Sequence, residues 1–210
     1  MIHTKNIIAA GKPINKATKA LVMIHGRGGS AEDILTLAEH LPVKDFALLA
    51  PEATGNSWYP YSFMAPVTNN EPGLSSALEL LKGVVKDIES NGIATKNIYF
   101  LGFSQGACLT LEFVARNAAR YGGVAAFTGG LIGAAINTDN YKGDFLNTPV
   151  FIGTSDPDPH VPVERVNASA TVLENMHAAV TKKIYKNMGH TITQEEINLV
   201  NDIIFNTTAA

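Results

Sequence analysis

The sequence contains one cysteine, Cys108, among its 210 residues. A lone thiol cannot form an internal disulfide and cannot supply a metal site built from several thiolates. The sequence also has no run of Lys or Arg, and its formal net charge is -3. Because a protein that binds a polyanion carries a basic patch or stripe, this charge pattern disfavours a nucleic-acid partner. We therefore expect neither a redox framework nor nucleic-acid binding.

Long apolar segments are also missing from the sequence. The first twenty residues have no extended apolar stretch behind a basic start, so they are not typical of a secretory signal. No later segment approaches the length of about 20 apolar residues that a membrane-spanning helix needs. We expect a cytoplasmic protein with no integral membrane association.

The overall composition is that of a folded protein. Hydrophobic residues make up 46% and charged residues 17% of the chain, values typical of soluble globular proteins rather than disordered or fibrous ones. A chain of 210 residues suits one domain with a substantial core, and no repeat, low-complexity tract or linker divides it. We therefore expect residues 1–210 to form a single domain with one active site.

Short apolar runs rich in β-formers alternate with longer segments of helical periodicity. This order is typical of a mostly parallel sheet covered by helices, an α/β fold. The expected strands are Leu21 to His25, Ala47 to Pro51, Ile98 to Phe103, Gly123 to Phe127, Val150 to Gly153 and Lys182 to Tyr185. The expected helices are Ala31 to Glu39, Gly73 to Ser90, Gly106 to Arg120, Val163 to Ala179 and Thr193 to Phe205. In such sheets ligands bind beyond the carboxyl ends of the strands, so the residues that follow each strand are the candidates for chemistry.

A Gly-x-Ser-x-Gly pattern, Gly102 to Gly106, lies between a strong strand pattern and a strong helix pattern. The five-residue pattern alone occurs by chance, but this context is that of a nucleophile elbow. The glycines permit a tight turn in which Ser104 is strained and its hydroxyl is exposed. The following helix directs its N-terminal amides toward the same point, which favours negative charge there. Ser104 is thus the candidate nucleophile, and Cys108, one helical turn later, is expected to be a small core residue.

A glycine-rich segment, residues 26–30, follows the first strong strand. Such a segment lets backbone amides approach a ligand closely, although many glycine-rich turns have no such role. If it lies beside Ser104, the amides of Arg27 and Gln105 form an oxyanion hole for a tetrahedral intermediate. We expect the neighbouring His25 to be a structural histidine rather than a base.

A serine nucleophile needs a neutral imidazole in hydrogen-bond reach and a carboxylate that fixes its tautomer. His190 follows the last expected strand, in a loop that can fold back over the elbow. The acid should follow the preceding strand, where two aspartates compete, Asp156 and Asp158. Asp156 is nearer the strand end and is the first choice, with Asp158 as the alternative. The order serine, acid, histidine is that of α/β hydrolases.

Together, the segments HGRGG, GFSQGA, GTSDPDPHVP and MGHTI span nearly the whole chain and resemble the phospholipase/carboxylesterase family, which includes the acyl-protein thioesterases. The resemblance implies a compact α/β-hydrolase fold. The connection between Thr128 and Pro149, where many such hydrolases insert a lid, is short, so we expect no large lid domain. The resemblance also implies a triad of Ser104, Asp156 and His190, oxyanion amides at Arg27 and Gln105, and no cofactor or metal. The family acts on carboxylic esters, lysophospholipids or thioester-linked acyl chains, which implies a small-molecule ester or thioester substrate.

The sequence departs from the family pattern in two places. Relatives commonly have Asp-Pro followed closely by Val-Pro, but here a second Asp-Pro intervenes, which leaves the choice of acid open. Gly29 also stands where thioesterase relatives often have an acidic residue, which argues mildly against copying their substrate preference. Carboxylesterase activity is therefore the first hypothesis. Lysophospholipase or thioesterase activity on the same triad is the alternative, and a binding protein without turnover is a further one.

An aromatic segment around Trp58 and Tyr59 resembles the tryptophan-containing loop of the family. With Tyr61, Phe63 and Met64, these side chains could line an acyl pocket, and we name Trp58 and Tyr59 as candidate substrate-binding residues. Packing in an ordinary core is an equally good interpretation of the same cluster. The sequence allows a homodimer but does not determine the oligomeric state.

Overall fold

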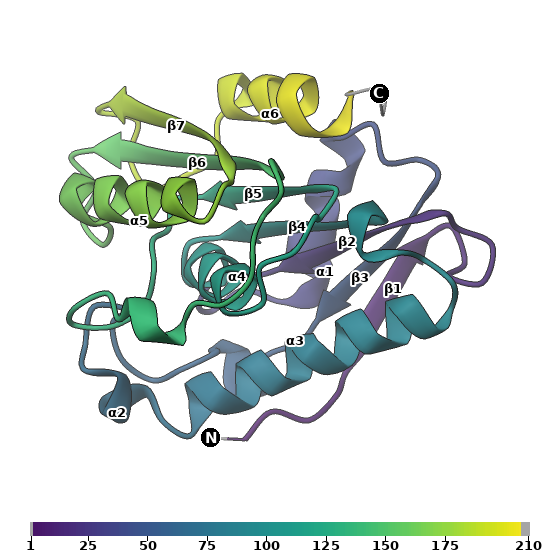
Figure 1. The fold of residues 1–210 in the computed structure, drawn as a ribbon, viewed down its shortest axis with the longest axis horizontal. Helices are drawn as coiled ribbons and strands as arrows, with labels where there is room; N and C mark the ends of the chain where they lie inside the picture. Colours follow the sequence, from purple (N-terminus) through teal and green to yellow (C-terminus); the bar gives the residue numbers. More distant parts are fainter. Residues whose placement is uncertain (1, 207–210) are drawn as a thin grey trace.

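The computed structural model describes residues 2–206 and contains one seven-stranded sheet (Figure 1). The strand order is β1-β3-β2-β4-β5-β6-β7, and all neighbours are parallel except β1 and β3. The strands are β1 Ile7–Gly11, β2 Lys19–Ile24, β3 Phe46–Pro51, β4 Ile98–Phe103, β5 Gly123–Phe127, β6 Pro149–Asp156 and β7 Ala179–Lys186. The prediction of a mostly parallel sheet is therefore confirmed.

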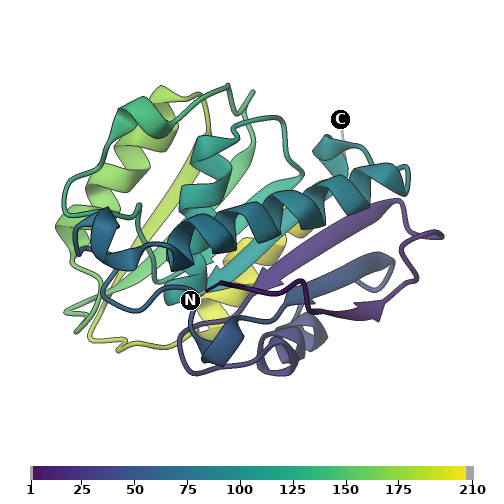
Figure 2. The same ribbon diagram turned by 90° about the horizontal axis from the view of Figure 1, so that it is seen from below.

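Helices cover both faces of this sheet (Figure 1, Figure 2). Helices α3, α4 and α5 pack on one face, while α1 and α6 pack on the other. The helices are α1 Ala31–Leu35, α2 Val67–Asn70, α3 Gly73–Ser90, α4 Gln105–Arg116, α5 Val163–Asn175 and α6 Gln194–Val200, and a π-helical turn, Asn201–Phe205, continues α6. Among the described residues, no helix has the length and apolar character needed to cross a membrane.

The sheet has a hydrophobic core on each side because successive strand side chains point to opposite faces. In β2, Val22 belongs to the core under α3, α4 and α5, whereas Leu21 and Met23 belong to the core under α1 and α6. All three side chains are fully buried. A strand buried on both faces has a nearly continuous apolar sequence, which is why this one was detectable as a short run.

The strand order determines where on the sheet a ligand site is expected. From β2 the chain adds β3 on one side and then crosses to β4 on the other side of β2. The loops that follow β2 and β4 therefore leave two adjacent strands in opposite directions. Ligands of open α/β sheets bind in the crevice between two such loops. The segments around Arg27 and Ser104 follow these two strands.

The structure corrects several element boundaries. The edge strand β1 was not predicted: its apolar run, Ile7 to Ala10, is short and half alanine, and Ala9, Ala10 and Gly11 are exposed. The helix predicted to end at Ala179 ends at Asn175, because His177 has a φ of 61°, which a continuing helix does not allow. The helix predicted to end at Arg120 likewise ends at Arg116. The capping box at Thr193 is confirmed, with its hydroxyl accepting from the Glu196 amide.

Candidate active site

Ser104 lies between the last residue of β4 and the first residue of α4, in a strained backbone conformation with φ 54° and ψ -118°. Glycine is required on both sides of it. A Cβ on Gly102 would lie 2.5 Å from Thr110 Oγ1, and one on Gly106 would lie 2.5 Å from the carbonyl oxygen of His25. Any side chain at these positions would push α4 away from β2 and β4. The sequence prediction of a nucleophile elbow thus has the backbone geometry that it requires.

The His190 imidazole connects Ser104 to a buried carboxylate. Its Nε2 atom lies 2.8 Å from Ser104 Oγ, and its Nδ1 atom lies 2.9 Å from Asp158 Oδ2. The side chain of Asp158 is inaccessible to solvent, and its other oxygen accepts the N–H groups of His160 and Val161 at 2.8 Å each. A carboxylate at Nδ1 keeps the proton on that nitrogen, which leaves Nε2 free to accept the serine proton.

The Asp158 carboxyl is electrostatically suited to this position. Burial alone would raise its pKa, but the hydrogen bonds from His190 and from the amides of His160 and Val161 outweigh burial, so the pKa lies below its ordinary value. The group is therefore ionised at neutral pH, as an acceptor for an imidazole N–H must be.

Asp158, and not the first choice Asp156, is the aspartate that contacts His190, so the choice of Asp156 is wrong. Strand β6 does not end at Gly153 but continues to Asp156, where it is still in register with Lys186 of β7. Asp156 is exposed at the end of this ladder, and the carboxylate that reaches His190 belongs to the residue two positions later. The second Asp-Pro pair is therefore the one that lies at the site.

The two expected oxyanion amides lie where the loop after β2 meets the elbow. A Cβ on Gly26 would lie 3.4 Å from Ser104 Cβ, so this loop packs directly against the serine. Neither the Arg27 nor the Gln105 amide donates to an acceptor within residues 2–206. Gln105 is the first residue of α4, where an amide has no partner inside the helix. Their role as an oxyanion hole stays a prediction, and both amides are free to perform it.

The Arg27 side chain holds the aromatic loop, residues 57–61. Its Nη1 donates to Ser57 Oγ at 2.8 Å and to the Pro60 carbonyl at 3.0 Å. Its Nη2 donates to the carbonyls of Tyr59 at 2.9 Å and Tyr61 at 2.8 Å. The loop is thus fixed by a side chain from the expected oxyanion loop.

Gln105 holds the same loop from the elbow. Its Oε1 accepts the Trp58 amide at 2.9 Å, and its Nε2 donates to the Tyr59 carbonyl at 2.8 Å. Neither the Arg27 nor the Gln105 contact was predicted, since each joins segments more than 30 residues apart along the chain. Both residues that carry the expected oxyanion amides therefore also position the loop through their side chains.

A pocket of about 680 Å³ opens above Ser104 and His190. Tyr59, Tyr61 and Phe63 from the aromatic segment line it, together with Phe103. This volume and this aromatic lining are typical of a small-molecule site. The prediction that aromatic residues of this segment line a pocket is confirmed for Tyr59, Tyr61 and Phe63.

Trp58 is a correction to the substrate-binding prediction. Its side chain is fully buried, and it is not part of the pocket lining. The indole N–H donates to the His25 carbonyl at 2.8 Å, and the ring packs between the rings of His3 and His25. Trp58 is therefore a core residue. Its ring can be fully buried because the indole N–H has a hydrogen-bond partner inside the protein.

His25 is structural, as predicted. Its Nδ1 lies 2.8 Å from the Gly26 carbonyl oxygen, and its Nε2 accepts the Ala53 amide at 3.1 Å. Cys108 is buried as expected, and its sulfur accepts the Gly130 amide. Burial raises the pKa of the Cys108 thiol to about 12. Within residues 2–206, no cluster of three or more His, Cys, Asp or Glu side chains is arranged to hold a metal ion.

A family model described as phospholipase/carboxylesterase matches residues 5–207. The chain belongs to this family. The match spans the sheet and every segment of the candidate site, so the family resemblance seen in the sequence is confirmed. The fold is that of the α/β hydrolases.

Individual relatives of this family member agree with the assignment. The crystal structure of a phospholipase/carboxylesterase from Dyadobacter fermentans is 57% identical, has a TM-score of 0.97 and covers 98% of this chain and 99% of that chain. A probable carboxylesterase, SOBER1-like, from Arabidopsis thaliana is 28% identical over 84% of this chain and 74% of its own length. Acyl-protein thioesterase 1 from Saccharomyces cerevisiae is 25% identical over 91% of this chain and 94% of its own length.

Proposed function

We propose that this family member is a serine carboxylesterase that hydrolyses carboxylic esters through an acyl-enzyme on Ser104. The observation that carries the proposal is the continuous chain of hydrogen bonds from Ser104 through His190 to Asp158. It lies under a pocket whose size suits a small molecule. The carboxylesterase names of relatives support the same substrate class.

In the first half-reaction, Ser104 Oγ attacks the acyl carbonyl carbon while its proton moves to His190 Nε2. The carbonyl electrons move onto the oxygen, and the amides of Arg27 and Gln105 bind the resulting oxyanion. Asp158 stabilises the imidazolium that forms. The intermediate then collapses: the carbon–oxygen bond to the alcohol breaks, His190 gives its proton to the leaving oxygen, and the acyl group stays on Ser104.

In the second half-reaction, a water molecule takes the place of the alcohol. His190 removes a proton from the water as the water oxygen attacks the acyl carbon. The bond from this carbon to Ser104 Oγ then breaks, His190 passes the water's proton to Oγ, and the acid is released. His190 must start each half-reaction neutral, since only the neutral imidazole can accept a proton at Nε2.

Thioester hydrolysis is the second candidate function. The yeast acyl-protein thioesterase aligns over almost its full length, and the same three side chains would serve a sulfur leaving group. A lysophospholipase would use them as well. These activities differ in what the pocket accepts rather than in the groups that react.

The test is hydrolysis of p-nitrophenyl esters of increasing acyl length by the wild-type protein and by Ser104→Ala. Loss of activity in Ser104→Ala, with an unchanged circular dichroism spectrum, would support the proposal. The chain-length profile would separate a short-acyl esterase from a long-acyl hydrolase, and a matched thioester series would measure the sulfur preference. If folded wild-type protein hydrolysed none of these and did not react with a fluorophosphonate probe, the hypothesis of a binding protein would replace this one.

A further inference from the structure

The pocket above Ser104 and His190, which we call the larger pocket, has charged residues of one sign only. Its described lining includes Arg27, His160 and His190, but no Asp or Glu. Ser62, Ser104, Gln105 and two tyrosines are further polar residues of the wall. Arg27 is thus the one residue of the described lining with a permanent charge.

The charge of Arg27 is not neutralised by its own contacts. Its four hydrogen bonds go to the Ser57 hydroxyl and to three backbone carbonyls, all of which are neutral acceptors. Within residues 2–206, no carboxylate lies within ion-pair distance of its guanidinium. The side chain is therefore fixed in place while its charge remains available to a ligand.

A second arginine adds to this field from behind the pocket wall. The buried Arg165 guanidinium lies 5.9 Å from the ring centre of Phe63 and donates only to the carbonyls of Leu131, Gly133 and Ala134. It too has no carboxylate partner among the residues that the structure describes. Charges separated from water by protein interact over longer distances than charges at an open surface.

The nearby acidic groups do not cancel both arginines. Glu112 is paired with Arg116 at 2.7 Å. Asp158 lies behind the His190 ring as seen from Ser104, and its oxygens already accept three N–H groups. Among the charges that line this pocket or lie directly behind its wall, Arg27 and Arg165 against Asp158 leave about one positive charge at neutral pH. The Asp33 carboxylate lies on the other side of the Arg27 loop.

We propose that this enzyme prefers esters that carry one carboxylate, in the acyl or the alcohol part, and that the carboxylate is bound in the larger pocket beside the Arg27 guanidinium. This inference rests on the proposed ester hydrolysis at Ser104. A single excess positive charge matches a carboxylate better than a doubly charged phosphate. His160, which is exposed and lies with its ring 5.0 Å from that of His190, adds a donor at the rim.

A smaller pocket of about 280 Å³ lies across the Arg27 loop and is unsuited to the charged group. Arg27 borders this pocket too, but here it is accompanied by Asp33, whose charge opposes its own, and by the apolar side chains of Ile34, Leu37 and Ile192. A carboxylate placed there would be repelled by Asp33 and would lose hydration to apolar walls. The uncharged part of the substrate suits this pocket instead.

The test compares pairs of esters that differ only in charge. Monoethyl glutarate and its amide, ethyl glutaramate, place the charge in the acyl part. O-acetylglycolate and O-acetylglycolamide place it in the alcohol part. The readout is kcat/KM for the acid divided by kcat/KM for the amide, because general damage to the site cancels in this ratio. We expect wild-type protein to favour the acid of at least one pair by roughly fivefold or more, the upper range for one solvent-accessible ion pair.

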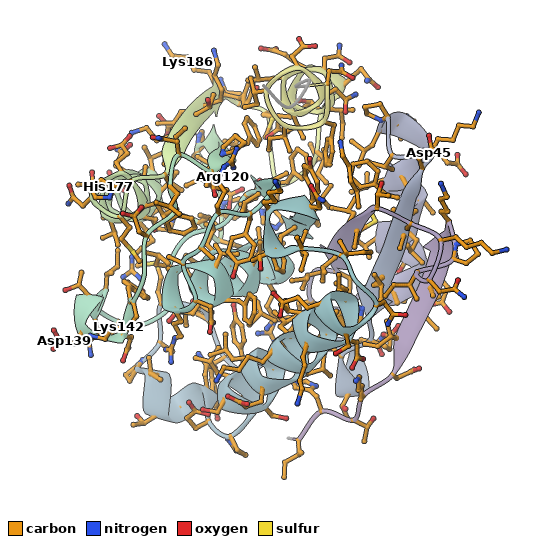
Figure 3. All side chains as sticks on the ribbon, turned by 45° about the vertical axis from the view of Figure 1, so that its right-hand side comes forward. Asp45, Arg120, Asp139, Lys142, His177 and Lys186 are labelled. Atoms are coloured by element: carbon orange, nitrogen blue, oxygen red, sulfur yellow. The ribbon has the colours of Figure 1, made fainter. Side chains whose placement is uncertain are left out.

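Three variants and a salt series separate charge from structure. Arg27→Gln should bring the ratio close to 1, whereas Arg27→Lys should keep most of it even if activity on both esters falls. Lys142→Gln is the control: it removes the same charge at the periphery (Figure 3), near Ala118 and beyond the end of α4 opposite Ser104. It should leave the ratio unchanged. If Arg27→Gln does not fold, raising the salt from about 0.05 to about 1 M should still lower the wild-type ratio by screening the charge.

Each result decides the question. The inference would be overturned, with the esterase intact, if wild-type protein hydrolysed both amides as fast as the acids or faster. It would also be overturned if Arg27→Gln left the acid-to-amide ratio unchanged. Where that variant does not fold, a ratio that does not change with salt would have the same meaning. Absence of hydrolysis of every ester, charged or neutral, would instead overturn the proposed function.

Discussion

Asp158 and His190 are joined by a hydrogen bond of 2.9 Å between Oδ2 and Nδ1, although 32 positions separate them in the chain. The carboxylate is held from the other side by two backbone amides, so its position does not depend on the histidine. The acid is therefore preorganised, and the ring is the partner that adjusts. This arrangement makes the two neighbouring aspartates, Asp156 and Asp158, experimentally separable.

The first prediction compares Asp158→Asn with Asp156→Asn. An amide at residue 158 can donate to the ring and stabilise the wrong tautomer, so kcat should fall by about 10³–10⁴. The same change at Asp156 alters an exposed strand end and should change kcat less than about twofold, as surface substitutions generally do. Steady-state kinetics on one p-nitrophenyl ester measures both. A larger loss at Asp156 would show that the acid is assigned to the wrong residue.

Why the sequence pointed to the wrong aspartate follows from how strands end. An apolar run reveals only the apolar part of a strand, here Val150 to Gly153. The ladder with β7 continues through Thr154 and Ser155, which are polar although buried, and ends at the exposed Asp156. Any count from the visible strand end therefore selects an acid too early in the chain.

Ser104 was predictable because it follows a buried, apolar strand and because the elbow needs glycine at fixed positions. His190 follows β7, which has no fully buried residue, and it was found by the chain order serine, acid, histidine. The side-chain contacts of Arg27 and Gln105 were not predictable, since hydrogen bonds to backbone carbonyls of a distant loop place no demand on the sequence of that loop. Trp58 illustrates the same limit. An aromatic cluster near a site does not reveal which rings face the ligand and which face the core.

The second prediction concerns the loop contacts of Gln105. Replacing it by alanine leaves the Trp58 amide buried without its partner, which costs about 1–3 kcal/mol, whereas the Tyr59 carbonyl keeps the Arg27 donor. We expect Gln105→Ala to lower the free energy of unfolding by about 1–3 kcal/mol in urea titrations. It should also raise KM, because the pocket wall loosens.

The control for this change is Gln194→Ala. Gln194 is exposed at the start of α6, where its amide donates only to Asn198. Its loss should change stability by less than about 0.5 kcal/mol. If both variants were equally stable, the Gln105 contacts would contribute nothing measurable, and the loop would be held by Arg27 alone.

The third prediction separates core from pocket in the aromatic segment. Trp58→Phe removes the hydrogen bond to the His25 carbonyl and part of the buried ring, so it should cost about 1–3 kcal/mol of stability. Its acyl chain-length profile should match the wild type. Tyr61→Ala should do the reverse, since Tyr61 lines the pocket and is 59% exposed. Thermal unfolding and the ester series measure the two effects, and a shifted profile in a fully stable Trp58→Phe would return Trp58 to the substrate site.

The fourth prediction uses the buried thiol. Because burial raises the pKa of Cys108 to about 12, the thiol stays protonated at pH 8, and the protonated form is a poor nucleophile. Native wild-type protein should react very slowly with Ellman's reagent at this pH and should release one equivalent of thiol only after unfolding in guanidinium chloride.

Ser104→Cys supplies the matched positive control, because it places a second thiol beside His190 at the accessible end of the same pocket. This variant should react rapidly in its native state with one thiol and retain Cys108 unreacted. Cys108 is among the residues that line the pocket, but it is almost inaccessible to solvent. Rapid reaction of native wild-type protein would mean that the pocket opens far enough to expose its thiol. The buried end would then be accessible to substrate, and the acyl group would have room to extend one helical turn beyond Ser104.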